Sequence, residues 1–508
     1  MNGAIEIRGS LLARNTVLNF VGQAVPLMVG VVTIPLIIRG LGTERFGILS
    51  LAWIVLGYFS LFDLGLGRAT TKFVAEYLGR GETDRLARLV WTSVALQGLL
   101  GVVGGLALAT LVPLLVDKVL NIPPQFVAET KGAFYLLALS IPVVILSASV
   151  RGVLEAGQRF DLVNAVQVPA SAATFLLPVV ALSFGADLFG IVVLLVTSRL
   201  VALLAYLALC FRAFPTLKRS FSIHLELVRP LFAYGGWITV SNVVGPILSY
   251  FDRFLIGSLL SMAAVAYYTA PLEVITRLWI IPSSLVMTLF PAFSTLGTTR
   301  KEDLRRLYAR SIKYLLLLTG PIVLLLVIFA DNVLQLWLGP GFAQQSTLTF
   351  QILLLGALIG LLAPVSGCLL QSLGRPDILS KLYLLYLPLN IGLVWLLVDN
   401  MGIVGAALSF ALRALVDTVL LFIISSRLIH LPYASFAENG LRRSVGFLLG
   451  FAGALWVASL IRVFPVQVGL VVIAILVFIM VTWHYVLDQM DKMVIISAMG
   501  KWSVLERP

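Results

Sequence analysis

The feature that most constrains this chain is a long series of apolar segments. Residues 466–487, for example, contain no Asp, Glu, Lys or Arg. A helix of about 20 apolar residues crosses about 30 Å of hydrocarbon, whereas a buried strand is much shorter. The period-two alternation of an outer-membrane barrel is missing from the sequence. The pattern therefore predicts an all-α integral membrane protein.

Composition supports a surface that is covered by lipid. Of the 508 residues, 60% are hydrophobic and 12% are charged, which is about half the charge of an ordinary soluble domain. The net charge of +12 would suggest a nucleic-acid partner in a soluble protein. Here the basic residues lie in short loops beside apolar segments, and no basic stripe carries interleaved aromatic residues. We therefore expect membrane lipids, and no nucleic acid, as partners.

The segments predict about 14 transmembrane helices. No cleavage site follows the first segment, so we interpret it as an uncleaved span. The predicted spans lie near residues 16–38, 46–66, 89–115, 132–153, 161–184, 188–211, 231–256, 264–291, 312–330, 349–372, 379–398, 402–425, 444–462 and 466–487.

The distribution of Lys and Arg predicts the orientation. Most of the 36 basic residues fall in alternate loops and in the two terminal segments. Cytoplasmic loops of membrane proteins are enriched in basic residues. We therefore expect the protein in a bacterial inner membrane with both termini on the cytoplasmic side. The opposite loops carry few basic residues, namely Arg39, Arg45, Lys118, Lys131 and Arg462.

Short internal matches indicate a repeat. Residues 190–192 and 402–404 are both Gly-Ile-Val, and a second match pairs Gly157 and Asp161 with Gly374 and Asp377. Six spans separate the copies, so both halves insert in the same direction, as in a parallel repeat. We predict an N-terminal lobe over 1–211, a cytoplasmic linker over 212–230, a second six-helix lobe over 231–430, and a C-terminal helix pair with a tail over 431–508.

Charged residues inside spans are costly and usually functional or paired. Guanidinium groups match the oxygen pairs of a phosphate. We therefore predict a substrate site that draws on six residues, Arg253, Arg277, Asn242, Arg199, Asn19 and Gln23. Alternative interpretations stay open: Glu273–Arg277 and Arg413–Asp417 fit neutralising i,i+4 pairs, and the Asn19–Gln23 stripe fits packing between helices.

Motifs of enzymes and of metal sites are absent from the sequence. There is no Walker A loop, GxSxG or HExxH, and Cys210 and Cys368 lie far apart. We predict a transporter that is not an enzyme, without a metal or other cofactor. Its energy source would be an ion gradient, the membrane potential or substrate flow, and the candidate coupling carboxylates are Glu273, Asp63 and Asp417.

Three motifs resemble those of a known family. They are LGTERFG at 41–47, FDLGLG at 62–67 and DRFLIG at 252–257. The chain resembles the polysaccharide transporter family, the Wzx-type O-antigen and exopolysaccharide flippases of the multidrug/oligosaccharidyl-lipid/polysaccharide superfamily. The resemblance covers most of the chain and is best over 10–90 and 231–310.

The resemblance implies the fold of the multidrug and toxin extrusion (MATE) exporters with two added helices. It also implies transfer of oligosaccharide linked to undecaprenyl diphosphate from the cytoplasmic to the periplasmic leaflet, by alternating access through a cationic central cavity. Proton or sodium coupling, and contact with a polysaccharide polymerase and other assembly proteins, are further implications. A cation-coupled multidrug exporter and a peptidoglycan-precursor (lipid II) flippase are the alternatives. A glycosyltransferase is disfavoured, because the loops outside the membrane are short.

Overall fold

The computed structural model describes residues 26, 28–58, 66–157, 159–218, 222–299, 301–432, 440–461, 463–487, 489 and 492. All regular elements within these residues are helices. Ten of the helices are long and apolar enough to cross a membrane, and the one over residues 377–428 has 52 residues, a length that suits two crossings. The prediction of an all-helical membrane protein is confirmed, whereas the count of 14 stays a prediction.

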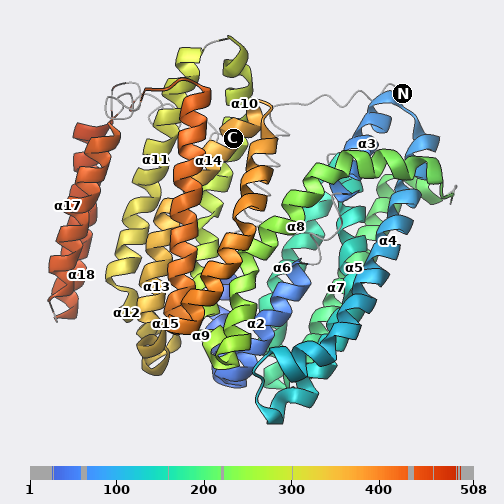
Figure 1. The fold of residues 1–508 in the computed structure, drawn as a ribbon, viewed down its shortest axis with the longest axis horizontal. Coiled ribbons are helices and arrows are strands. Elements are labelled where there is room, and N and C mark those ends of the chain that lie inside the picture. The colour runs from blue at the N-terminus through green and yellow to red at the C-terminus, as the bar shows by residue number, and fades with distance from the viewer. Residues whose placement is uncertain are drawn as a thin grey trace, which may run out of the picture. The chain divides into compact units, whose positions relative to one another are not determined.

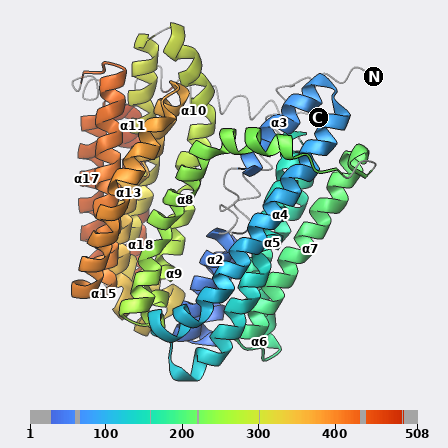
Figure 2. The same ribbon diagram turned by 45° about the vertical axis from the view of Figure 1, so that its right-hand side comes forward.

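The helices form two compact units, which we describe separately (Figures 1 and 2). The first unit contains residues up to Val274 together with Leu379–Ala406. Its described helices are one over Met28–Leu41, α2 (Thr43–Tyr58), α3 (Leu66–Arg80), α4 (Thr83–Leu114), α5 (Val127–Ala156), α6 (Phe160–Ser183), α7 (Leu188–Ala213), α8 (Val228–Leu259), most of α9 (Met262–Leu278) and the first half of α15 (Pro376–Leu428).

Helix α5 lies at the centre of the first unit, between α4 and α7 (Figure 2). Small residues of α4 allow a close approach to α5. A Cβ atom on Gly101 would lie 2.6 Å from the Pro142 Cα, and one on Gly105 would lie 2.7 Å from the Ala138 carbonyl oxygen. Such contacts between small residues drive helix association in lipid, where the hydrophobic effect contributes little.

The second unit contains Ile275–Ile378 and residues from Ala407 onward. Buried side chains of α11, α17 and α18 pack together there, among them Leu316, Leu448, Phe451 and Phe478. Its described helices are α10 (Ile280–Thr299), α11 (Lys301–Ile328), α12 (Ala330–Leu338), α13 (Pro340–Gly360), α14 (Ala363–Ser372), the second half of α15, α17 (Leu441–Ser459) and α18 (Phe464–Val481).

The long helix α15 is interrupted at Gly402. This residue has φ 59° and ψ −139°, so the chain is not helical there. A side chain is strained at such a φ value, which explains the glycine. The break falls at the first residue of the predicted span 402–425, which is also the first residue of the Gly-Ile-Val match.

The structure extends the second sequence match to a side-chain contact. Before α6, Arg159 Nε lies 3.1 Å from Asp161 Oδ1. Before α15, Arg375 Nε lies 3.1 Å from Asp377 Oδ1. The matched segments thus make the same local ion pair, which supports the repeat, while its parallel symmetry stays a prediction.

The predicted linker lies against α4. Trp91 Nε1 donates to the Leu217 carbonyl oxygen at 3.0 Å, and the His224 N–H donates to Thr92 Oγ1 at 2.9 Å. The first unit also includes α8 and most of α9, which the sequence division assigns to the second lobe. The lobe boundaries stay a prediction about membrane topology.

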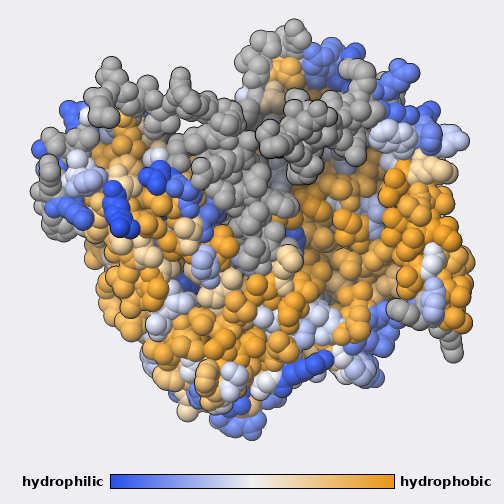
Figure 3. Space-filling view, turned by 180° about the vertical axis from the view of Figure 1, so that it is seen from behind, coloured by the Kyte–Doolittle hydropathy of each residue, from blue (hydrophilic) through white to orange (hydrophobic). Residues whose placement is uncertain are grey.

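Apolar side chains dominate the outer faces of the helices. On the face in Figure 3, hydrophobic residues dominate the middle of the described surface, and hydrophilic residues gather toward its upper and lower edges. Among the exposed side chains are Leu139, Leu204, Leu389, Leu449 and Leu476. This distribution matches a hydrocarbon surrounding rather than water.

The first turn of α7 offers a test of helix capping. Asp187 precedes the helix, and its Oδ1 accepts a hydrogen bond from the Gly190 N–H at 2.9 Å. We expect Asp187→Ala to destabilise the protein by about 1 kcal/mol, because that N–H loses its partner. Asp187→Asn keeps an acceptor and should cost much less. Thermal unfolding in detergent measures both, and equal losses would contradict the capping role.

Candidate functional site

A polar cavity lies among α5, α6 and α7 in the first unit. Its volume is about 230 Å³, many times the ~10–15 Å³ that one water needs. No carboxylate lines it within the described residues. The lining residues are Val144, Ser147, Ala148, Arg151, Gln167, Ala170, Ser171, Arg199, Ala202 and Tyr206.

Two arginines give this cavity a basic character. Arg199 Nη2 donates to Thr174 Oγ1 at 3.0 Å, which is the one hydrogen bond of this side chain within the described part of the chain. Arg151 Nε lies 3.2 Å from Glu155 Oε1, a pair that is partly exposed. Each guanidinium group has five N–H donors, which is more than these contacts use. Both arginines therefore keep donors that could bind an anion.

A second polar cluster joins α8 to α9. Asp252 accepts a short hydrogen bond from the Tyr268 hydroxyl, and its Oδ1 accepts the Arg253 backbone N–H at 2.8 Å. Arg253 is only 4% exposed, and its guanidinium carbon lies 5.1 Å from the centre of the Tyr250 ring. The buried Arg253 Nε has no hydrogen-bond partner among the described residues. Such a donor is costly unless a ligand or water meets it.

The other predicted site residues are distributed as follows. Glu273 is half-buried on α9 in the first unit. Arg277, in the last turn of α9, and Asp417, on α15, are half-buried and belong to the second unit. Arg413 lies with its guanidinium carbon 5.7 Å from the Phe410 ring centre.

Four of the predicted residues have side chains that the structure does not describe. Asn242 lies in α8, and its side chain is not described. Asn19, Gln23 and Asp63 lie outside the described residues. The roles of the Glu273–Arg277 and Arg413–Asp417 combinations stay predictions.

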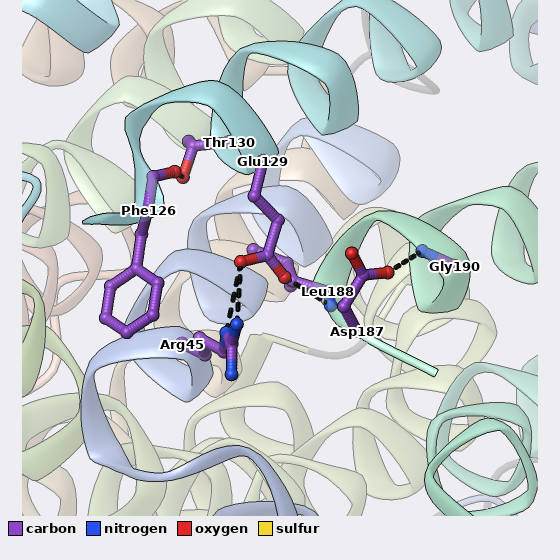
Figure 4. Close-up of polar contacts among 7 residues, drawn as sticks. All are labelled: Arg45, Phe126, Glu129, Thr130, Asp187, Leu188 and Gly190. Atoms are coloured by element: carbon purple, nitrogen blue, oxygen red, sulfur yellow. Dashed lines mark hydrogen bonds and ion pairs between the residues drawn. The ribbon is translucent and has the colours of Figure 1, made fainter. Parts of the chain in front are cut away.

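Figure 4 shows a third polar cluster, where α2, α5 and α7 begin. Arg45 donates to Glu129 Oε2 from Nε at 3.1 Å and from Nη2 at 3.0 Å. Glu129 Oε1 accepts the Leu188 backbone N–H at 2.6 Å. The Arg45 guanidinium also lies 4.6 Å from the Phe126 ring centre. These contacts tie three helix ends together, so we assign this cluster a structural role.

Comparison with known proteins places these features in a family. The family model described as polysaccharide biosynthesis protein matches residues 12–296, more than half of the chain. The chain belongs to the polysaccharide biosynthesis protein family. A second family model, described as MatE, matches residues 238–396. The predicted membership among Wzx-type flippases is confirmed.

Individual relatives agree with this assignment. A putative O-antigen transporter of Shigella flexneri is 28% identical over 412 residues, which cover 81% of this chain and 96% of that protein. An inward-facing MATE family transporter has a TM-score of 0.71 at 15% identity, with 82% of this chain and 99% of that chain covered. The lipid II flippase MurJ has a TM-score of 0.71 at 11% identity, with 93% and 99% covered. The two solved structures show a shared fold.

As a member of this family, the chain is a multi-pass membrane transporter and not an enzyme. No group of three His, Cys, Asp or Glu residues that could hold a metal occurs within the described residues.

Sequence reasoning missed two features of this polysaccharide biosynthesis protein. Glu129 was not singled out, because its partners Arg45 and Leu188 lie far away along the chain. The Asp252–Tyr268 bond has a spacing of 16 residues across two helices, which no helical periodicity predicts. The DRFLIG motif marked the segment but not the contact.

Proposed function

We propose that this protein transfers oligosaccharide linked to undecaprenyl diphosphate from the cytoplasmic to the periplasmic leaflet of a bacterial inner membrane. The observation that carries the proposal is the match to the Shigella flexneri putative O-antigen transporter over 96% of that protein's length. A relationship over nearly the whole length favours a shared type of cargo more strongly than a shared fold does.

The charge of the polar cavity supports an anionic cargo. Arg151 and Arg199 line it and no described carboxylate does. In a medium of low dielectric constant, a diphosphate is attracted by these cations and a cationic drug is repelled. The cavity therefore favours a diphosphate-linked substrate over the substrates of a cation-coupled multidrug exporter.

An apolar cavity in the second unit suits part of an isoprenoid tail. Its volume is about 360 Å³, and apolar side chains dominate its wall. Close van der Waals contact between the tail and these side chains would stabilise it, because the hydrophobic effect contributes little in lipid. The described wall comes from α11, α13, α14, α15 and α17, and it includes Leu316, Leu358, Phe422 and Leu448.

The proposal includes the predicted topology and site. Fourteen helices in two parallel six-helix lobes, with a C-terminal pair, would alternate access to a cationic cavity, with both termini in the cytoplasm. Arg253, Arg277, Asn242, Arg199, Asn19 and Gln23 would contact the substrate. Glu273, Asp63 and Asp417 are the proposed carboxylates for proton or sodium coupling. A polysaccharide polymerase and other assembly proteins are proposed partners.

Transfer in proteoliposomes tests the proposal. We expect the intact protein to move a fluorescent oligosaccharide linked to undecaprenyl diphosphate between leaflets. Arg253→Ala should lower the initial rate at least about tenfold, since a buried cation with a free donor is lost. Arg253→Lys keeps the charge and should retain more activity, and thermal unfolding identifies variants that fail to fold.

Other cargoes distinguish the alternatives. Faster transfer of lipid II than of the oligosaccharide lipid would indicate a peptidoglycan-precursor flippase. Export of cationic dyes without transfer of any diphosphate lipid would contradict the proposal and indicate a drug exporter.

A further inference from the structure

We propose that the cavity among α5, α6 and α7 is a binding site for phosphate oxyanions, and that it holds the diphosphate of the transported lipid. The second part rests on the proposed function. The first part rests on the geometry of the cavity alone, and the following observations carry it.

Each of the three helices presents one continuous face to the cavity. On α7, Arg199, Ala202 and Tyr206 follow one another at steps of three and four residues. On α5, Ala148 and Arg151 are three residues apart. Residues at these spacings lie on the same side of a helix. The cavity is therefore formed by the regular register of the helices.

The side chains that reach the cavity are mostly hydrogen-bond donors. The side chains of Gln167, Ser171 and Tyr206 make no hydrogen bond within the described part of the chain. Ser147 already donates to the Val143 carbonyl oxygen at 2.7 Å. A wall of amide, hydroxyl and guanidinium donors without a carboxylate matches the oxygens of a phosphate, which accept hydrogen bonds.

The two arginines are each held by one neighbouring side chain, which leaves other N–H donors free to bind a ligand. Glu155 holds Arg151 from one side, and Thr174 holds one nitrogen of Arg199. The buried Arg151 Nε has no hydrogen bond of good geometry among the described residues. Small residues at Ala148, Ala170 and Ala202 leave the space between them open. Since cations in a membrane-spanning segment are costly, two arginines on one open cavity indicate an anionic ligand.

A neighbouring apolar hollow between α6 and α7, which shares Ala170 and Ala202 with the basic cavity, provides a matched control. It is lined by Val166, Leu177, Leu194, Thr197 and Val201 among others, and no charged residue lines it. Thr197 is exposed on this side of α7, two residues before Arg199. A change at Thr197 therefore alters the same helix without touching the basic cavity.

Binding of defined probes to the full-length protein in nanodiscs tests the site. The probes are farnesyl diphosphate, farnesol and inorganic pyrophosphate. We expect farnesyl diphosphate to bind at least tenfold more tightly than farnesol. Arg199→Gln and Arg151→Gln should each weaken farnesyl diphosphate binding at least about tenfold, with Thr197→Val unchanged. Arg199→Lys should fall between the intact protein and Arg199→Gln.

The outcomes separate this site from the proposed function. Equal affinity of the intact protein and a folded Arg199→Gln variant for farnesyl diphosphate would overturn the site, even if transfer of the lipid continued. Loss of binding in Arg199→Gln, in a protein that transfers no oligosaccharide lipid, would leave the site standing while the proposed function fails. Pyrophosphate that binds as tightly as farnesyl diphosphate would support the oxyanion site and overturn its assignment to a lipid.

Discussion

Replacement of Gly47 by alanine is expected to remove most of the folded protein from the membrane. A Cβ atom at this position of α2 would lie 1.8 Å from the Met262 carbonyl oxygen at the start of α9. Real Cβ atoms essentially never approach closer than 3.0 Å, so the two helix backbones would have to separate. Overpacking against a backbone atom costs several kcal/mol. Size-exclusion chromatography of detergent-solubilised protein measures the folded fraction.

The control for this change is Gly450→Ala. Gly450 lies in α17, and a Cβ atom there would have no neighbour within 4 Å. This variant should give as much folded protein as the natural sequence, or slightly more, because alanine favours a helix over glycine. A full yield of folded Gly47→Ala protein would show that α2 and α9 do not pack as described.

The second large effect is expected for Glu129→Ala, which should destabilise the protein by about 2–4 kcal/mol. The glutamate side chain is 10% exposed and binds both the Arg45 guanidinium and the Leu188 backbone N–H. Its removal leaves the Arg45 guanidinium without its carboxylate and the Leu188 N–H without its acceptor, and both losses are costly in a partly buried position. Figure 4 shows that the Glu129 carboxylate, on α5, contacts residues at the starts of α2 and α7. Thermal unfolding in detergent measures the loss.

Two controls isolate that effect. Asp117 pairs with Lys131 at 2.7 Å, but both side chains are about one-third exposed or more, so Asp117→Asn should cost less than about 1 kcal/mol. Arg45→Met combined with Glu129→Ala should cost less than the sum of the single changes, because the two residues interact directly. Strictly additive losses would contradict the ion pair.

The membrane spans could be predicted from the sequence, because the hydrocarbon of the bilayer requires a continuous run of apolar residues at each crossing. Each crossing needs about 20 apolar residues whose backbone groups bond within the same helix. The segment 466–487 shows this without any tertiary information, and the structure places α18 there. The family motif at 252–257 was likewise visible in the chain, and it marks the segment where Arg253 is buried.

The contacts between side chains of different helices could not be predicted from the sequence in this way. Arg199 is a costly charge in a span, which the sequence reveals, but its neighbour Thr174 is 25 residues away on another helix. Arg151 lies near the end of the predicted span 132–153, and the structure places it on the wall of the same cavity as Arg199. The packing of two helices depends on residues that are far apart in the sequence. The periodicity within one helix does not show which other helix it contacts.

The sequence by itself therefore determined the class of this protein, an all-helical membrane transporter of a flippase family, because length, hydropathy and motifs are local properties. The tertiary structure alone decided that α8 and most of α9 pack with the first unit, that Glu129 joins three helix ends, and that two arginines share one cavity. Each of these depends on the close approach of helix backbones, which small residues such as Gly47 and Gly101 permit but do not specify.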